Sequence, residues 1–297
     1  MKTLTIFTPA YNRAYCLGKC YESLLRQTNQ EFIWLIIDDG STDETGKLVD
    51  SWVKEQKIEI QYYYQENQGM HGAHNKAYQL IETDLNMCID SDDYLADGAV
   101  EKIIHFWQKN GNKDVSGIIG LDADQHQRVI GTRMPAQIKR STLFNLYNKY
   151  GVTGDKKLVY RTELTNKYPY PIFQDEKYVG LAFKYYKLDQ EYEMLLLDEV
   201  LCHVEYLEDG STHNMINQYR KNPKGFAFYR KELMKLPYAG QLFKFRQAIH
   251  FVSSSLMMRN QYFLKESPKK GLTLLAIPFG LLLYVYILFK SRTVKHV

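Results

Sequence analysis

Cysteine is scarce in this sequence and is not spaced for zinc binding or for crosslinking. The 297 residues include four cysteines, Cys16, Cys20, Cys88 and Cys202, and no C-x-x-C pair. Structural zinc sites and disulfide frameworks require closer or more numerous cysteines. We therefore expect reduced thiols in a cytosolic chain.

Proline and glycine, at 8 and 18 residues, are also too few for a collagenous or low-complexity protein. The sequence shows no internal repeat, and no glycine-rich phosphate loop follows its first apolar run, which argues against a nucleotidyltransferase. The opening residues, MKTLTIFTPAYNR, turn polar after Pro9 and predict a strand rather than a signal peptide. We expect the protein to work in the cytoplasm.

Acidic residues are nearly missing from the C-terminal region. Residues 1–211 carry a net charge of −9, whereas residues 212–297 hold 15 Lys and Arg against two acids and carry +13. The basic residues are interleaved with long apolar stretches, which argues against nucleic-acid binding. An acidic body with a basic, apolar tail is instead typical of contact with an anionic membrane surface.

Strand-like and helix-like periodicities alternate over the first hundred residues. Short apolar runs predict strands at 4–8, 32–37 and 85–89, and alternation of apolar and polar residues predicts another at 58–64. Helical spacing predicts helices at 14–27, 43–55 and 72–81. This alternation predicts βαβ units on a parallel sheet. In open sheets of this kind ligands bind at the carboxyl ends of the strands.

Polar clusters follow all four of these predicted strands. In chain order they are PAYNR at 9–13, DDGSTD at 38–43, ENQG at 66–69 and DSDD at 90–93. Carboxylates gathered at one sheet edge repel one another unless a cation lies among them. Oxygen ligands suit Mg²⁺ or Mn²⁺, which take one or two carboxylates together with substrate phosphates.

Together the four clusters, with the H-N-K-A that follows ENQG, resemble glycosyltransferase family 2 over about residues 1–210. The later segment from GDKKLVYRTEL to YPYPIFQDEKY looks like small bacterial members that build capsular or exopolysaccharide units. The resemblance implies an inverting enzyme with a nucleotide-sugar donor. The implied fold is GT-A, a Rossmann-like mixed α/β sheet flanked by helices, here with a basic helical C-terminal extension that associates with a membrane.

The resemblance also implies roles for individual residues. Tyr11 would pack on uracil, Asp39 would bond the base or ribose, and Asp92 would ligate the metal that bridges two phosphates. Asp90 would face ribose or donor sugar and complete the D-x-D metal motif. The full set implied for nucleotide-sugar binding is Pro9, Ala10, Tyr11, Asn12, Asp39, Asn67, Gly69, His71 and Asp90.

A catalytic base is expected at Glu176, with Asp175 as the alternative and plain helix capping as a third interpretation. The family pattern often reads Gly-Glu-Lys-Phe, so this chain has Asp175 where a glycine is usual. We expect the two acids to open a helix over 175–186, where they would favour its dipole. A carboxylate at the acceptor hydroxyl typically contributes ~10²–10⁴-fold.

The C-terminal region ends in 18 uncharged residues, 272–289, with Lys and Arg on both sides. This is slightly short for a spanning helix, and Pro278 and Gly280 lie midway. We expect a re-entrant or in-plane anchor first, a true span second, and an interface in a homodimer third. We therefore expect a catalytic domain over residues 1–211 and a basic helical region over residues 212–297. Within the catalytic domain, the nucleotide-binding half would extend to about residue 110 and the acceptor half would cover 111–211.

These features predict a metal-dependent inverting transferase that moves a sugar from a UDP-sugar to a lipid-linked saccharide on the cytoplasmic face of a bacterial membrane. The alternative is a non-catalytic nucleotide-sugar-binding partner of a membrane glycosyltransferase. The intact DSDD cluster and the acid at position 176 argue against that alternative.

Overall fold

A computed structural model describes residues 2–205 and 215–293. The chain forms two compact units. Unit 1 contains Met1–Asn67, Gly72–Pro169 and Glu191–Leu207, and unit 2 contains Gln68–His71, Tyr170–Gln190 and Glu208–Val297. The expected boundary at 211 falls within 206–214, outside the described residues. Residues 170–190, expected in the first domain, cluster with the C-terminal helices instead.

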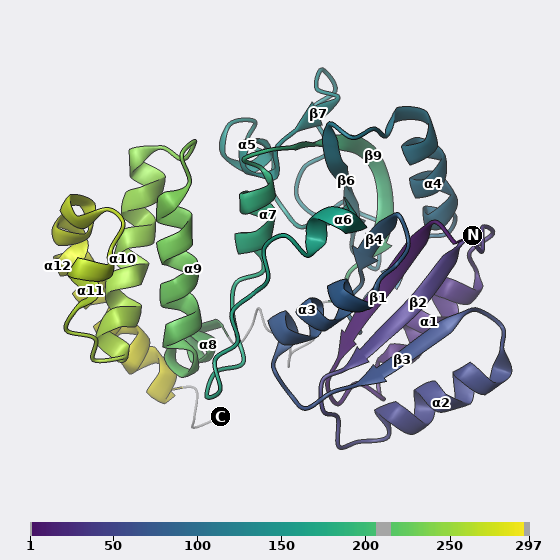
Figure 1. The fold of residues 1–297 in the computed structure, drawn as a ribbon, viewed down its shortest axis with the longest axis horizontal. Helices are drawn as coiled ribbons and strands as arrows, with labels where there is room; N and C mark the ends of the chain where they lie inside the picture. The colour runs from purple at the N-terminus through teal and green to yellow at the C-terminus, as the bar shows by residue number, and fades with distance from the viewer. Residues whose placement is uncertain (1, 206–214, 294–297) are drawn as a thin grey trace. The chain divides into compact units, whose positions relative to one another are not determined.

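Unit 1 is an α/β unit built around one sheet (Figure 1). Its elements are β1 (Leu4–Ala10), α1 (Leu17–Leu25), β2 (Phe32–Asp38), α2 (Thr45–Glu55), β3 (Ile60–Tyr64), α3 (Met70–Leu80, which begins in unit 2), β4 (Leu85–Cys88), β5 (Tyr94–Leu95), α4 (Ala99–Asn110), β6 (Val115–Ala123), β7 (Arg140–Ser141), α5 (Leu143–Asn148), β8 (Lys156–Arg161), α6 (Thr162–Thr165) and β9 (Glu193–His203).

The sheet runs in the order β3-β2-β1-β4-β8-β6-β9-β5, with β7 paired to β9. The strands β3, β2, β1 and β4 are parallel, and Ile6 at the centre pairs with Trp34 on one side and Met87 on the other. The strand β8 then runs antiparallel to both β4 and β6. The predicted βαβ half is confirmed, and the whole sheet is mixed, as the fold class predicted.

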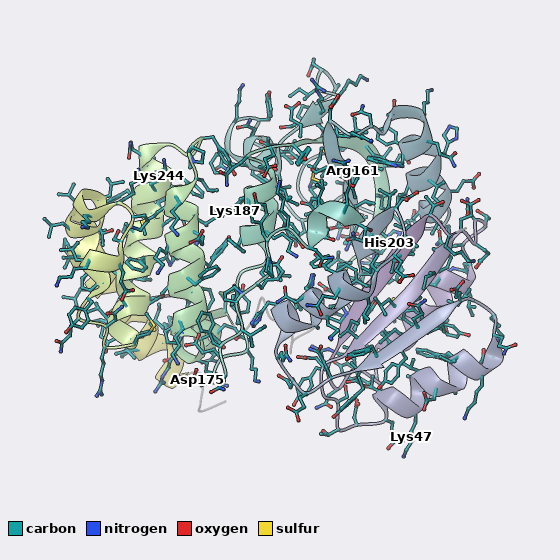
Figure 2. All side chains as sticks on the ribbon, viewed as in Figure 1. Lys47, Arg161, Asp175, Lys187, His203 and Lys244 are labelled. Carbon is teal, nitrogen blue, oxygen red and sulfur yellow. The ribbon has the colours of Figure 1, made fainter. Side chains whose placement is uncertain are left out.

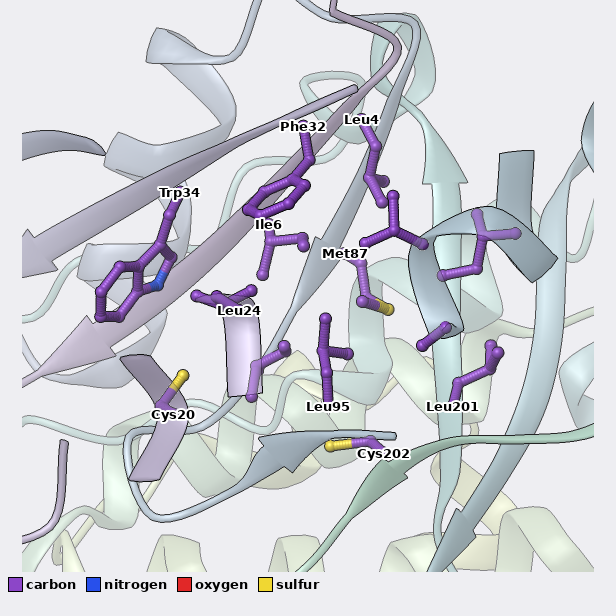
Figure 3. Close-up of a cluster of buried hydrophobic side chains, with 14 of the residues drawn as sticks. Leu4, Ile6, Cys20, Leu24, Phe32, Trp34, Met87, Leu95, Leu201 and Cys202 are labelled. Carbon is purple, nitrogen blue, oxygen red and sulfur yellow. The ribbon is translucent and has the colours of Figure 1, made fainter. Parts of the chain in front are cut away.

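Successive side chains of the central strands face opposite sides of the sheet. Leu4 and Ile6 of β1 join a core with α1, α2 and α4, which includes Trp34 (Figure 3). Phe7 faces the other side, where its ring contacts His74 and Tyr78 of α3 edge-on. Helices therefore cover both faces, and the strand ends are left to carry the polar clusters.

Unit 2 consists of helices. They are α7 (Ala182–Leu188), α8 (Met215–Lys221), α9 (Pro223–Lys235), α10 (Gln241–Met257), α11 (Phe263–Glu266) and α12 (Lys270–Thr293). The helix α10 packs against both α9 and α12. Their shared core contains Ala227, Phe251, Val252 and Ala276.

Two expectations about unit 2 are wrong. No helix begins at Asp175: residues 173–176 form a tight turn, and α7 starts at Ala182. The reason is tertiary, because Glu176 and Lys177 are held by hydrogen bonds to residues 222–225. The re-entrant reversal at Pro278 does not occur either, since α12 continues through that proline as one helix.

Candidate active site

The predicted site residues fall into two groups, one in each unit. Unit 1 carries the site residues that follow the neighbouring parallel strands β1 to β4. Unit 2 carries the two residues around the start of α3 and the two candidates for the catalytic base. The unit 1 group is Pro9, Ala10, Tyr11, Asn12, Asp39, Asn67, Asp90 and Asp92, and the unit 2 group is Gly69, His71, Asp175 and Glu176.

The end of β1 presents a tyrosine ring. Pro9 and Ala10 still belong to the strand and are buried, whereas Tyr11 is 49 % exposed. A half-exposed ring beside a sheet edge is available to pack on a planar base, as the resemblance implied for Tyr11.

Asn12 joins the first two loops. It adopts a left-handed backbone with φ of +54°, and its Oδ1 accepts hydrogen bonds from the backbone N–H groups of Thr42 (2.8 Å) and Asp43 (3.3 Å). Its own N–H donates to Ser41 Oγ at 2.8 Å. Asparagine tolerates this backbone region better than most residues. In this structure Asn12 therefore positions the loops around the site.

Asp38, the last residue of β2, and Asp39, which follows the strand, are both almost fully buried. Asp38 accepts hydrogen bonds from the Ser41 N–H and the Tyr62 hydroxyl, both at 2.7 Å, so it fixes the loop. Asp39 accepts one from Gln65 Nε2 at 2.7 Å, and its N–H donates to the Ala10 carbonyl. The Gln65 contact orients the Asp39 carboxylate at the junction of three strand ends.

Asn67, after β3, lies against the loop that follows β2. Gly40 has φ of +87°, and a Cβ there would lie 2.9 Å from the Asn67 backbone nitrogen. A side chain at position 40 would therefore push the two loops apart, which gives the glycine of the DDGSTD cluster a steric reason.

The DSDD cluster forms a turn directly after β4. Asp93 N–H donates to the Asp90 carbonyl at 3.0 Å and closes the turn. Asp90 is exposed, Asp92 is half-buried, and Asp93 is buried. The three acids are thus unequal in exposure, and only Asp93 is buried.

Asp93 belongs to a buried charge cluster that the sequence reasoning missed. Lys157 of β8 is buried, and its Nζ lies 3.8 Å from an oxygen of Asp93 and 3.8 Å from an oxygen of Asp122 on β6. Burial raises the pKa of Asp93 to about 8 and that of Asp122 to about 6, although Lys157 acts in the opposite direction. The sequence does contain a sign of this cluster, because Asp122 and Lys157 are charged residues within strands. A charge buried in a strand needs a partner of opposite sign.

Asp90 and Asp92 are the residues that fit a divalent ion. Within residues 2–205 and 215–293, no three His, Cys, Asp or Glu side chains are grouped closely enough to hold a metal by themselves. Mg²⁺ commonly binds through one or two carboxylates with substrate phosphates completing its shell. An exposed and a half-buried carboxylate, with Asp93 engaged by Lys157, are compatible with that mode of binding.

Gly69 and His71, at the start of α3, pack in unit 2 against Lys177. Gly69 has φ of +79°, and a Cβ there would lie 2.1 Å from the Lys177 carbonyl oxygen. His71 is buried with neither ring nitrogen hydrogen-bonded, and burial together with the nearby Lys177 lowers its pKa to about 4. His71 is therefore neutral at physiological pH and can donate one hydrogen bond.

Glu176 holds the first turn of α9. One carboxylate oxygen accepts from the Lys224 N–H at 2.8 Å and the other from the Gly225 N–H at 2.7 Å. Since a helix N-terminus has unpaired N–H groups and a positive partial charge, a buried carboxylate is stabilised there. Burial nevertheless raises the pKa of Glu176. The acid does cap a helix, but the helix is α9 rather than the one expected at 175–186.

Asp175 differs from its neighbour in its exposure and in the direction of its pKa shift. Its carboxylate is exposed, and both oxygens lie 2.6 Å from Lys224 Nζ, which lowers its pKa (labelled in Figure 2). The Asp175 side chain is thus exposed and paired with an exposed ammonium group, whereas both oxygens of the buried Glu176 are engaged with the backbone.

A cavity of about 530 Å³ lies elsewhere in unit 1. Its lining includes Thr83 and Asp84, which precede β4, and Arg161, which ends the antiparallel β8. Asp90 follows β4, so the cavity is at the opposite end of that strand from the DSDD turn. None of the predicted site residues lines it.

Comparison with known proteins identifies the family. The model of Glycosyl transferase family 2 matches residues 5–168, which is more than half of the chain. The chain therefore belongs to glycosyltransferase family 2, and the resemblance seen in the four strand-end clusters is confirmed.

Curated relatives match over the N-terminal part. A teichoic acid poly(glycerol phosphate) polymerase of Staphylococcus epidermidis is 36 % identical over 115 residues, which cover 38 % of this chain and 16 % of the polymerase. Glycosyltransferase GlyG of Streptococcus pneumoniae is 30 % identical over 118 residues, or 39 % of this chain and 38 % of GlyG. The matched part is thus well under two thirds of either relative.

Solved structures share the fold over nearly the whole chain. S. aureus TarS in complex with UDP-GlcNAc superposes with a TM-score of 0.65 at 17 % identity, covering 99 % of this chain and 92 % of that one. A mannosyltransferase from Pyrobaculum calidifontis, in complex with GDP-Man and Mn²⁺, gives 0.57 at 15 % identity, covering 98 % and 75 %. At these identities the likeness shows the fold alone, and it confirms the predicted GT-A class.

Proposed function

We propose that this protein transfers a sugar from a UDP-sugar to a lipid-linked saccharide acceptor, with inversion, in the synthesis of a bacterial cell-surface glycan. The observation that carries the proposal is the edge of unit 1, where Tyr11, Asp39, Asp90 and Asp92 follow three neighbouring parallel strands of a family 2 fold. The TarS complex with UDP-GlcNAc supports the UDP-sugar donor, and the names of the curated relatives support a role in cell-surface glycan synthesis.

The donor site follows from the chemistry of these residues. The Tyr11 ring would pack on the base, and the Asp39 carboxylate, oriented by Gln65, would accept hydrogen bonds from base or ribose. Asp90 and Asp92 would hold Mn²⁺ or Mg²⁺, which stabilises the charge that develops on the leaving diphosphate by several kcal/mol. The neutral His71 and the backbone at Gly69 are proposed for the donor side.

We assign the base to Asp175 and a positioning role to Glu176. A general base needs an oxygen that the acceptor hydroxyl can reach. Asp175 offers exposed oxygens, whereas both oxygens of Glu176 accept backbone hydrogen bonds from α9. This reverses the order expected from the sequence, in which Glu176 stood first.

Three variants test these assignments. Asp92→Asn removes a metal ligand, so metal-dependent UDP binding and turnover should fall together. Asp175→Asn should leave UDP binding unchanged and lower turnover by ~10²-fold or more. Glu176→Gln should lower the stability of unit 2 by about 1–3 kcal/mol, because the amide cannot accept from both N–H groups. Turnover lost in Glu176→Gln at full stability, and retained in Asp175→Asn, would return the base to Glu176.

The basic C-terminal region and α12 support a location at the cytoplasmic face of the membrane, as a peripheral or monotopic protein. The helix α12 contains a stretch, Lys270–Ser291, that is long and apolar enough to cross a membrane. A lipid-linked acceptor gives such a segment a purpose, because it keeps the transferase where its acceptor is embedded.

A further inference from the structure

The helix α12 has two opposite faces, although its sequence is apolar all round. Thr273, Ala276 and Ile287 are buried, and a Cβ on Gly280 would lie 2.5 Å from the Val252 side chain of α10. At 3.6 residues per turn these four positions lie on one stripe. This stripe is the surface by which α12 packs along α10.

The exposed residues of α12 form the other face, which we call the apolar face. Its most exposed members are Leu275, Leu282 and Phe289, spaced seven residues apart and 66, 68 and 72 % exposed. With Leu274, Phe279 and Val285 they fall within an arc of about 140° on the side opposite the buried stripe. The helix is about 36 Å long, so this is a large continuous apolar surface.

Basic residues flank this face. Lys269 and Lys270 precede it, Lys290 follows it, and all three are exposed. Residues 212–297 contain only two acidic residues, Glu232 and Glu266. An apolar stripe with cations at both ends fits the boundary between acyl chains and anionic headgroups.

Packing against α10 argues against a bilayer crossing by α12. Gly280, at the middle of α12, contacts the part of α10 that contains Ile249 and Val252, and Phe279 contacts Phe245. A span would bring this part of α10 to the bilayer centre, with Arg246 and His250. Charged and polar side chains are costly there. Proline 278 also lacks the N–H that the Leu274 carbonyl would need, which water and headgroups can replace at the interface.

We propose that unit 2 binds anionic lipid through the apolar face, with α12 lying in the plane of the membrane and remaining packed on α10. The inference rests on the membrane association proposed above and adds how it occurs. Lipid cannot surround the whole bundle, because α9 covers another side of α10. There Arg230 of α9 donates a hydrogen bond to Gln247 of α10 at 2.8 Å.

The test uses the full chain with vesicles of phosphatidylcholine alone or of equimolar phosphatidylcholine and phosphatidylglycerol. Co-sedimentation should be strong with the anionic vesicles and only partly reversed by salt. The triple variant Leu275→Glu, Leu282→Glu and Phe289→Glu should bind at least about tenfold more weakly. Val53→Glu, at an exposed apolar position in unit 1, is the matched control and should bind as the unaltered chain does.

Orientation is measured with Lys270→Cys and Lys290→Cys, labelled on intact vesicles by a maleimide that does not cross membranes. Both introduced cysteines should react. Labelling of the unaltered chain gives the contribution of its own four cysteines, which is subtracted. Protection of Lys290→Cys in vesicle-bound protein would mean a span, which overturns the in-plane arrangement but not membrane association. Absence of vesicle binding would overturn both. If vesicle binding is absent and the protein forms a dimer that the triple variant abolishes, the apolar face is an interface with a second copy of the chain. The proposed binding of the UDP-sugar donor does not depend on any of these outcomes.

Discussion

Replacing Lys157 by methionine removes the ammonium group that lies 3.8 Å from oxygens of both Asp93 and Asp122. All three side chains are at least nine-tenths buried. Breaking a buried ion pair by removing one partner costs about 3–5 kcal/mol, because the remaining charge is left without compensation. We expect a loss of this size in the free energy of unfolding of unit 1 near neutral pH.

The loss should depend on pH, and its sign follows from the two carboxyl groups. Lys157 lowers the pKa of Asp93 and of Asp122, which burial raises to about 8 and about 6. Without Lys157 both pKa values rise further. A carboxyl whose folded pKa exceeds its unfolded value of about 3.9 favours folding at low pH and loses that contribution as pH rises. The deficit should therefore grow above about pH 6, where Asp122 ionises in the unaltered protein, and further above about pH 8, where Asp93 also ionises, by up to about 1.4 kcal/mol per pH unit for each group.

Urea unfolding followed by tryptophan fluorescence measures this directly, since Trp34, Trp52 and Trp107 all belong to unit 1. Lys102→Met is the matched control. Its ammonium pairs with Glu199 at 3.1 Å on the exposed surface, so the change should stay within about 1 kcal/mol at every pH. A Lys157→Met deficit below about 1 kcal/mol, or one that does not vary with pH, would refute the buried cluster.

Two further variants probe other parts of the structure. Asp39→Ala removes an acceptor for base or ribose and should weaken UDP binding roughly ten- to a hundredfold in calorimetry, and an unchanged Kd would remove Asp39 from the site. Gly280→Leu should destabilise unit 2 by about 1–3 kcal/mol in urea unfolding followed by circular dichroism, because its side chain would overlap Val252. Gly271→Ala, where a Cβ meets nothing within 4 Å, is the control and should be neutral or slightly stabilising.

The parallel half of the sheet could be predicted from the sequence because its signals are local. β1, β2 and β4 are apolar runs and β3 lies in an alternating segment, and a polar cluster closes each of them. The structure starts and ends these strands within a few residues of the predicted positions. The edge that gathers Tyr11, Asp39 and Asp92 follows from strand order alone. The family match then confirmed what the clusters indicated.

What the sequence could not supply depends on contacts between distant residues. The 175–186 helix was predicted from acids in a local pattern, yet Glu176 is bound to the start of α9, 48 residues away. In the sequence, Asp93 cannot be told apart from the other acids of DSDD. Its contact with Lys157 depends on the position of β8 in the folded sheet. Likewise, uniform apolarity conceals which side of α12 faces α10.

The release of UDP from a UDP-sugar tests the proposed function most directly. The purified full chain is incubated with Mn²⁺, a membrane lipid extract as acceptor, and a panel of UDP-, GDP- and CMP-sugars, and released nucleotide is measured. We expect turnover with at least one UDP-sugar, and loss of that turnover in Asp92→Asn. Protein that binds UDP but turns over no sugar nucleotide, or turnover that Asp92→Asn leaves intact, would contradict the proposed function.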